Sequence, residues 1–294
     1  MNAMQDLVGR VCIVTGSNSG IGKATALGLA QLEATVVMVC RDLERGRSAQ
    51  ADIVSETGSK SVDLMICDLV SQRSIRQFAA EFKAKYGRLH ILINNAANFD
   101  QSLRNPVITE DGVETIFATN HLGPFLMTNL LLDTLKANAS SRVLTVASKG
   151  LITYPFLSIE FDNLNGQKRF SAQHAYYHSK LAQVIFTFDS AERLKGTGVT
   201  VNCIRVPNVQ IDKGRYDHIT GWKRRAYEIK RRTAITPKRM AEAYIRLAIA
   251  PEFENATGKY FDENCKEVKA YKRAYDRAVW HRLWQVSESL TGLA

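Results

Sequence analysis

Tyr176 and Lys180 have the residue types and the spacing needed for proton transfer, four residues apart in His174-Ala-Tyr-Tyr-His-Ser-Lys180. Apolar residues recur every three or four positions from Leu181 to Leu194, which predicts a helix with both side chains on one face. A free phenol has a pKa of about 10, and a nearby ammonium lowers it. Such a tyrosine can exchange a proton with an alcohol or a carbonyl at neutral pH. The same spacing also occurs on solvated helix faces, so the pair needs support from elsewhere.

Support comes from a glycine-rich turn near the N-terminus. A β-branched run over residues 10–15 precedes it, and a good helix former over residues 23–30 follows it. Glycines let the backbone approach a pyrophosphate closely, and a helix N-terminus presents free N–H groups to it. A strand-to-helix turn without a ligand is the alternative, and the complete strand, turn and helix pattern disfavours it. We therefore expect a nucleotide to be bound by Gly16, Ser17, Asn18, Ser19, Gly20, Ile21 and Gly22.

The residue after the second expected strand, 34–40, indicates which nucleotide is bound. In dinucleotide folds a carboxylate at this position binds the ribose 2′-OH, whereas an arginine accommodates a 2′-phosphate. Here Cys40 ends the strand and Arg41 follows it. A guanidinium suits a phosphate, which favours NADP over NAD as the cofactor. In the alternative interpretation Arg41 begins a solvated loop and Asp42 caps the next helix.

Strands and helices alternate along the chain. Strands are expected at residues 10–15, 34–40, 61–67, 89–93, 143–147, 199–206 and 258–261, and helices at 23–30, 71–86, 109–137, around Tyr176 and at 238–249. This alternation predicts an α/β fold: a single Rossmann-type, doubly wound parallel sheet of about seven strands with helices on both faces. Residues 1–294 show no linker or repeat, so we expect a single dinucleotide-binding catalytic domain. The strand ends bring one set of residues to one sheet edge: Gly16, Arg41, Asp68, Asn95 and Ser148.

The composition is that of a soluble globular protein, with 45% hydrophobic and 23% charged residues. No secretory h-region occupies residues 1–10, and no apolar run is long enough to span a bilayer. The five cysteines form no CxxC pair, and four of them fall in expected strands. Buried thiols of this kind indicate a reducing compartment, and we expect a cytoplasmic location.

The net charge of +10 is concentrated in residues 213–239, which hold ten basic and two acidic side chains, a net +8. The remainder of the chain is close to neutral, so we expect no nucleic-acid partner. Three interpretations of the basic segment stay open. It is a solvated helix, a site for an anionic substrate tail such as a phosphate or CoA, or a peripheral contact with an acidic membrane surface.

Five motifs occur in the order typical of one family: Thr15-Gly16-x-x-x-Gly20-x-Gly22, Asn94-Asn95-Ala96, Asn120, Ser148 and Tyr176-x-x-Ser179-Lys180. Together they resemble the short-chain dehydrogenase/reductase family over residues 8–262. Shorter stretches, including Cys40-Arg41-Asp42 and residues 193–199 and 283–292, resemble its retinol-dehydrogenase-like branch, which includes the WW-domain oxidoreductase. That branch mostly prefers NADP and acts on lipophilic alcohols and carbonyls.

The resemblance implies roles for the motif residues. Tyr176 would be the general acid in reduction and the base in oxidation, with its pKa lowered by Lys180, which would also hold the nicotinamide ribose. Ser148 would hydrogen-bond the substrate oxygen, and Asn120 would order Lys180 and a water. Considered without the other motifs, Ser148 would be an ordinary hydroxyl at the end of a strand, and Asn120 would be an amide that bends a helix. Further cofactor contacts are implied for Asp68, Leu69, Asn95, Ala96, Pro207 and Val209.

The chain departs from the family pattern at three places. Ala97 replaces a glycine, Pro207-Asn208 stands where Pro-Gly is usual, and Asp212 occupies the usual position of a threonine. Asparagine tolerates positive φ, so we expect the turn at Asn208 to survive. Asp212 would add a negative charge beside the nicotinamide. This change motivates an alternative, a catalytically weakened nucleotide-binding regulatory or scaffold protein; a member that reduces a C=C bond or a biosynthetic ketone is a third reading.

Predictions also follow for the basic segment, the C-terminal segment and a pair of histidines. The family places a substrate lid after the sixth strand, here the basic residues 207–239. Residues 263–294 form a C-terminal helical extension whose apolar face packs over the sheet edge or against a partner subunit of a homo-oligomer. His174 and His178 have a zinc-compatible spacing but no third ligand, so no metal is expected.

Overall fold

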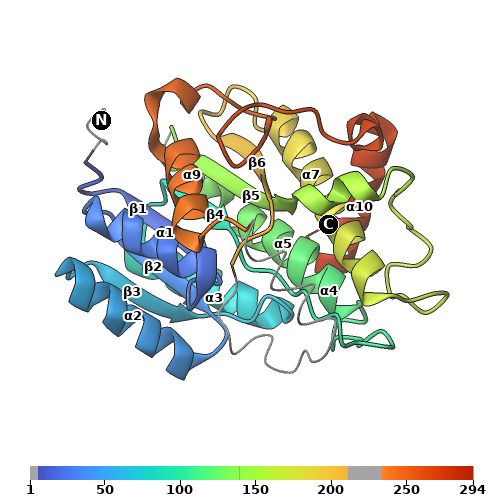
Figure 1. Cartoon of the computed structure of the whole chain (residues 1–294), viewed down its shortest axis with the longest axis horizontal. Coiled ribbons are helices and arrows are strands. Elements are labelled where there is room, and N and C mark those ends of the chain that lie inside the picture. Colours follow the sequence, from blue (N-terminus) through green and yellow to red (C-terminus); the bar gives the residue numbers. More distant parts are fainter. Residues whose placement is uncertain (1–5, 139, 211–233, 294) are drawn as a thin grey trace.

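The computed structural model describes residues 6–138, 140–210 and 234–293, which form a parallel sheet with helices on both faces (Figure 1). The strand order is β3-β2-β1-β4-β5-β6-β7, and every neighbouring pair is parallel. This confirms the predicted fold class. The strands are β1 Val11–Thr15, β2 Thr35–Cys40, β3 Val62–Ile66, β4 Ile91–Asn94, β5 Arg142–Ser148, β6 Thr200–Val206 and β7 Tyr260–Phe261.

Both faces of the sheet are covered, as the unbroken apolar strand sequences require. Along β1, Cys12 and Val14 face a core shared with α1 and α9, whereas Val11 and Ile13 face a core shared with α3 and α5. A third core lies between α7, α10 and the carboxyl half of the sheet. The helices are α1 Gly20–Gln31, α2 Leu43–Thr57, α3 Gln72–Tyr86, α4 Thr115–Phe117, α5 Gly123–Leu130, α6 Leu132–Ala137, α7 Ala172–Arg193, α9 Pro237–Ile249 and α10 Arg277–Thr291.

The continuous helix predicted over residues 109–137 is wrong. Residues 109–114 form a turn, in which Gly112 has a φ of 78° and Thr109 N–H bonds to the Val113 carbonyl. Glu114 then caps α4 by accepting from the Ile116 and Phe117 amides. A π-helical turn, Ala118–Leu122, separates α4 from α5, and a break at Leu131 separates α5 from α6. Apolar periodicity survives these interruptions, which is why the sequence pattern hides them.

The C-terminal extension packs its apolar face on α7, whereas the sequence predicted packing over the sheet edge or against a partner subunit. Trp284 of α10 contacts Phe125 and Phe186 edge-on or stacked, and the Arg193 guanidinium lies 3.9 Å from the Trp284 ring centroid. The Gln72 and Arg76 side chains of α3 donate hydrogen bonds to carbonyls at its end. Helix α10 is therefore held by ring contacts with α5 and α7 and by hydrogen bonds from α3.

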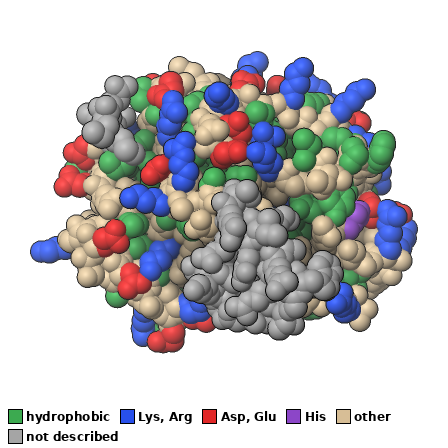
Figure 2. All heavy atoms as spheres, in the orientation of Figure 1, with side chains coloured by type: hydrophobic (Ala, Val, Ile, Leu, Met, Phe, Trp, Pro, Cys, Tyr) green, Lys and Arg blue, Asp and Glu red, His purple; other side chains and the backbone are tan. Residues whose placement is uncertain are grey.

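Only the margins of the expected lid lie in the described part of the chain. Val209 forms a parallel bridge with Ile235, and Thr236 caps α9 through the Arg239 amide. Asp212 and eight of the ten basic residues of the segment 213–239 lie outside the described residues. Among the helices that are described, none has both the length and the apolar character needed to cross a bilayer. On the face seen in Figure 2, positive and negative side chains are mixed over the described surface.

Candidate active site

The turn between β1 and α1 is shaped by glycines. A Cβ on Gly22 would lie 2.3 Å from the Gly16 carbonyl oxygen, and one on Gly16 would lie 2.9 Å from the Ala96 Cα. Gly16 also has a φ of 66°. Gly20 has a φ of 56°, but open space surrounds the position of its missing Cβ. The turn is thus tightly packed at Gly16 and Gly22 and open at Gly20, where the amides of the first turn of α1 are free of intrahelical partners.

Two side chains fasten this turn to the end of β4. Asn95 Nδ2 donates to the Thr15 carbonyl oxygen at 2.8 Å, and the Ala96 amide donates to Thr15 Oγ1 at 2.9 Å. Ser17 is fully buried, with its Oγ 3.6 Å from the Cys40 Sγ. Asn95 and Ser17 therefore support the turn from inside, and Thr15 joins them in this role, which sequence reasoning did not assign to it.

The ends of β2 and β3 lie beside the turn. Arg41 is exposed, while Asp42 accepts from the Arg45 amide and caps α2, so the two interpretations of this segment are compatible. Asp68 Oδ1 accepts from the Val70 amide at 3.1 Å, which leaves its second oxygen available to a ligand. Leu69 is buried, and a Cβ on Gly123 would lie 2.7 Å from its carbonyl oxygen.

Ser148 at the end of β5 and Tyr176 in the second turn of α7 come together at the carboxyl edge of the sheet. Burial raises the pKa of Tyr176 and the Tyr177 phenol raises it further, whereas a side-chain hydrogen bond with Ser148 lowers it. The predicted lowering of this pKa by Lys180 is wrong in the described structure. Desolvation disfavours the phenolate more strongly than the neighbouring groups favour it.

Lys180 lies below Tyr176 on the same face of α7. Its Nζ donates to the Val146 carbonyl oxygen at 2.8 Å and lies 5.6 Å from the Tyr176 ring centroid. Burial lowers the pKa of Lys180 to about 8. The ammonium is therefore held against β5 at a fixed place, in a low-dielectric environment where it readily gives up its proton.

Asn120 lies in the π-helical turn and connects two segments around Tyr176. Its Oδ1 accepts from the Asn98 amide at 2.6 Å, and its Nδ2 donates to the Asn98 carbonyl and to Ser179 Oγ, both at 3.0 Å. Ser179 Oγ in turn donates to the Tyr176 carbonyl. Within the described residues, Asn120 is bonded to the loop after β4 and to α7, and not to Lys180 as expected.

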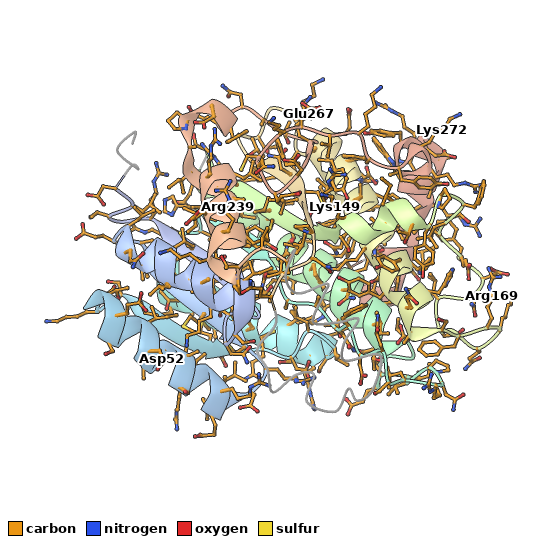
Figure 3. All side chains as sticks on the ribbon, in the orientation of Figure 1. Asp52, Lys149, Arg169, Arg239, Glu267 and Lys272 are labelled. Atoms are coloured by element: carbon orange, nitrogen blue, oxygen red, sulfur yellow. The ribbon has the colours of Figure 1, made fainter. Side chains whose placement is uncertain are left out.

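Aromatic rings cover the phenol. The Phe99 ring centroid lies 4.2 Å from that of Tyr176, which lies 5.3 Å from that of Tyr177, which lies 4.6 Å from that of Tyr154. Gly150 permits this wall, since a Cβ there would lie 2.3 Å from the Tyr177 hydroxyl. Beside it, Lys149, labelled in Figure 3, forms an ion pair with Glu263 at 2.9 Å.

Beyond β6 the backbone differs from expectation. Pro207 and Val209 are half-buried, and the Gln210 amide bonds to the Ile235 carbonyl. The described non-glycine residues with positive φ are Glu33, Ser140 and Cys265, so the positive φ expected at Asn208 is wrong. Ala97, another of the three altered positions, is exposed. The chain continues as an extended segment that pairs with residue 235, and it needs no left-handed residue.

The model of the family described as short chain dehydrogenase matches residues 10–215. The chain belongs to the short-chain dehydrogenase family. Human retinol dehydrogenase 14 is 39% identical over 97% of this chain and 87% of its own length, and human retinol dehydrogenase 13 is 41% identical over 97% and 85%. These similarities assign this short-chain dehydrogenase to the retinol-dehydrogenase-like branch.

Solved structures show the same fold. A protein from Mycobacterium paratuberculosis matches with a TM-score of 0.74 and 29% identity, covering 99% of this chain and 96% of that one. An NADPH-complexed short-chain dehydrogenase from Escherichia coli CFT073 matches with a TM-score of 0.66 and 22% identity, covering 88% and 98%. At that identity the second match concerns the fold alone.

Sequence reasoning missed two features of this short-chain dehydrogenase site. Phe99 follows the Asn94-Asn95-Ala96 motif by three residues, and an aromatic residue next to a motif loop is the signal that could have indicated its contact with Tyr176. The second feature is Glu160, in the stretch expected to be irregular. It bonds to the helix that carries Tyr176, and nothing in its spacing indicates this.

Proposed function

We propose that this short-chain dehydrogenase is an NADP(H)-dependent oxidoreductase for lipophilic alcohols and carbonyls, with Tyr176 as its acid/base. One observation carries the proposal: Tyr176 and the buried Lys180 of α7 lie beside Ser148 at the carboxyl end of β5, the strand next to β4 in the sheet. In open α/β sheets ligands bind in the crevice at this edge.

The glycine turn fits a nicotinamide dinucleotide. Space remains above Gly20 and the first amides of α1, and the Cβ-free positions at Gly16 and Gly22 keep the backbone close to β4. When bound, the nicotinamide supplies or accepts the hydride. Asp68 would bind the adenine end and Ala96 the adenosine ribose, while Pro207 and Val209 would lie along the nicotinamide.

Proton transfer falls to the residues around Tyr176. Ser148 Oγ donates to the substrate oxygen, where negative charge develops, and holds the phenol in line with it. Tyr176 delivers its proton to the same oxygen in reduction. Its raised pKa keeps the phenol protonated at neutral pH, which suits the donor role and hence carbonyl reduction. Lys180 replaces the proton, since its lowered pKa makes the ammonium a ready donor.

The preference for NADP rests on Arg41, an exposed guanidinium directly after β2 with Asp42 occupied as a helix cap. We expect Arg41→Ala to weaken NADPH binding about tenfold, the loss of one charge-assisted contact, and to leave NADH binding unchanged. Titration of both cofactors against both proteins measures this. Equal losses for NADPH and NADH would contradict the assignment.

The lipophilic substrate class follows from the relatives and from the surface near Tyr176. Phe99 is 46% exposed, and its ring centroid lies 4.2 Å from that of Tyr176. Exposed apolar side chains around a catalytic group provide contacts for an apolar substrate body. Long apolar aldehydes, from decanal to retinal, are therefore the first panel of substrates to test.

The experiment follows NADPH consumption with this panel and with short polar aldehydes. We expect turnover with the long aldehydes, and losses of about 10³-fold in Tyr176→Phe and about 10²-fold in Ser148→Ala, in proportion to the proton and the hydrogen bond removed. NADPH binding without turnover on any carbonyl, the same in both variants as in the unaltered protein, would favour the rival regulatory or scaffold function.

A further inference from the structure

The histidine pair that brackets Tyr176 lies on the far side of α7. His174 and His178 are each two residues from Tyr176, about 200° away around an α-helix. His178 is buried, with its ring centroid 5.5 Å from that of Phe117 in α4. The two histidines therefore face the region behind the catalytic surface, between α4 and the segment that follows β5.

A single backbone group connects His178 to that segment. The Glu160 amide donates a hydrogen bond of 2.9 Å to His178 Nε2. An imidazole nitrogen can accept only when it carries no proton, so the bond requires the neutral ring with its proton on Nδ1.

The Glu160 side chain fastens the rest of the loop. Its Oε1 lies 2.5 Å from Arg169 Nη2 and 3.3 Å from His174 Nε2, and its Oε2 accepts from Asn163 Nδ2 at 3.3 Å. Arg169 lies on the outer side of this loop in Figure 3. The backbone amide of Glu160 thus bonds to His178, and its carboxylate contacts His174, four residues earlier on α7.

We propose that Glu160 and His178 form a clasp that positions Tyr176, with His178 as a positioning residue that accepts the Glu160 amide and holds the first two turns of α7 against α4. Four chain segments meet here: the loop 157–170, α7, α4 and the π-helical turn that carries Asn120. Tyr176 lies between the two clasp histidines along the helix, so release of either one lets the phenol shift relative to Ser148. A displacement of about 1 Å at a reacting group costs on the order of 10²-fold in rate.

Several charged or titratable groups surround His178. His174 neighbours it on α7, Glu160 and Arg169 come from the loop, His121 from the π-helical turn, and Glu114 from the cap of α4. Burial and then His174 lower the pKa of His178 to about 4, while Glu160 raises it. The acceptor is therefore present at neutral pH and is lost as the pH falls toward that value.

The test compares His178→Gln, whose amide oxygen reaches about as far as Nε2 and cannot titrate, with His178→Ala, which has no acceptor. His281→Ala, at an exposed histidine of α10, is the matched control. We expect His178→Ala to lower kcat about thirtyfold with KM for NADPH within twofold, and His178→Gln to recover kcat to within threefold. The acid-side decline of kcat near pH 4–5 should be absent in His178→Gln and present in the control.

A second readout does not depend on turnover. Backbone hydrogen exchange of residues 172–180 should be about tenfold faster in His178→Ala than in the unaltered protein and restored in His178→Gln. Glu160→Gln keeps the amide but loses the ion pair with Arg169 and the carboxylate contact with His174. It should show an intermediate rate, and it covers the case in which His178→Ala fails to fold.

The kinetic part rests on the proposed function, and the exchange part does not. If the unaltered protein reduces no carbonyl, the proposed function fails and hydrogen exchange alone decides the clasp. Unchanged exchange in His178→Ala, or equal losses in the alanine and glutamine variants, would overturn the clasp whatever the activity.

Discussion

The two halves of the sheet position their functional groups by different means. On the β1–β4 side the backbone does it: Gly16 and Gly22 allow a contact that any Cβ would block, and the first turn of α1 presents its amides. On the β5–β7 side long-range side-chain bonds do it, from Lys180 to β5 and from His178 to Glu160. A backbone-shaped site is therefore sensitive to added atoms, whereas a side-chain-shaped site is sensitive to protonation and to lost partners.

Acid should distinguish the halves most strongly. Burial lowers the pKa of His121 to about 3 and of His178 to about 4, both behind α7. Between pH 4 and 6.5 the unfolded chain binds protons that the folded one does not, so stability falls as the pH falls through this range. We expect a loss of about 3 kcal/mol for each histidine between pH 7 and pH 4.

Denaturant titrations at several pH values measure this loss. On the β1–β4 side, His90 is only half-buried, and burial together with the charges of Arg10 and Arg88 lowers its pKa. Because its ring is less desolvated than those of His121 and His178, we expect it to contribute less to the acid sensitivity. His178→Gln should remove about half of the acid sensitivity, and a His90→Gln variant should remove clearly less. If His90→Gln removed as much of the acid sensitivity of unfolding as His178→Gln, the two halves of the sheet would not differ in their response to pH.

An added methyl tests how the glycine turn on the β1–β4 side is shaped. Gly22→Ala brings a Cβ to 2.3 Å from the Gly16 carbonyl oxygen and should cost about 3 kcal/mol in the free energy of unfolding, with NADPH binding at least tenfold weaker. Gly20→Ala meets no neighbour and adds only the strain of its positive φ, about 1 kcal/mol.

Thermal or chemical unfolding and NADPH titration of the two glycine variants give the comparison. If Gly20→Ala proves as damaging as Gly22→Ala, the close approach to Gly16 is not what shapes the turn.

Helix caps should show no difference between the halves. Asp42 caps α2 through the Arg45 amide at 3.0 Å, and Asp276 caps α10 through the Ala278 amide at 3.0 Å. Asp42→Ala and Asp276→Ala should each cost about 1 kcal/mol, because each removes the acceptor of a helix-end amide. Denaturation midpoints check this, and a cost near zero in one half alone would show that its helix ends depend on other contacts.

The β1–β4 half of the sheet, with its glycine turn, is also the half that the sequence predicts well. Glycine at a strand-to-helix turn has a steric meaning that does not depend on distant residues, so residues 16–22 could be placed directly. The sheet could also be predicted from local sequence, because buried parallel strands are continuous apolar runs. Arg41 and Asp42 were also placed correctly after β2, because strand ends are local.

The β5–β7 half could be predicted only in part. Tyr176 and Lys180 share a helix face by periodicity, but their pKa values depend on burial, which spacing does not encode. The bond between Asn120 and Asn98 and the clasp at Glu160 join segments far apart in the chain, and each uses a residue type that is common on surfaces. The π-helical turn around Asn120 keeps the apolar pattern of an α-helix and so escapes detection.

The most direct measurement is the rate of NADPH consumption in the first turnover with a long-chain aldehyde, for Tyr176→Phe and for its neighbour Tyr177→Phe. Both variants remove one hydroxyl from the same aromatic wall, so they differ in proton donation and hardly in packing. The account predicts a loss of about 10³-fold for Tyr176→Phe with NADPH still bound, and less than tenfold for Tyr177→Phe. Tyr176→Phe within tenfold of the unaltered rate would contradict it.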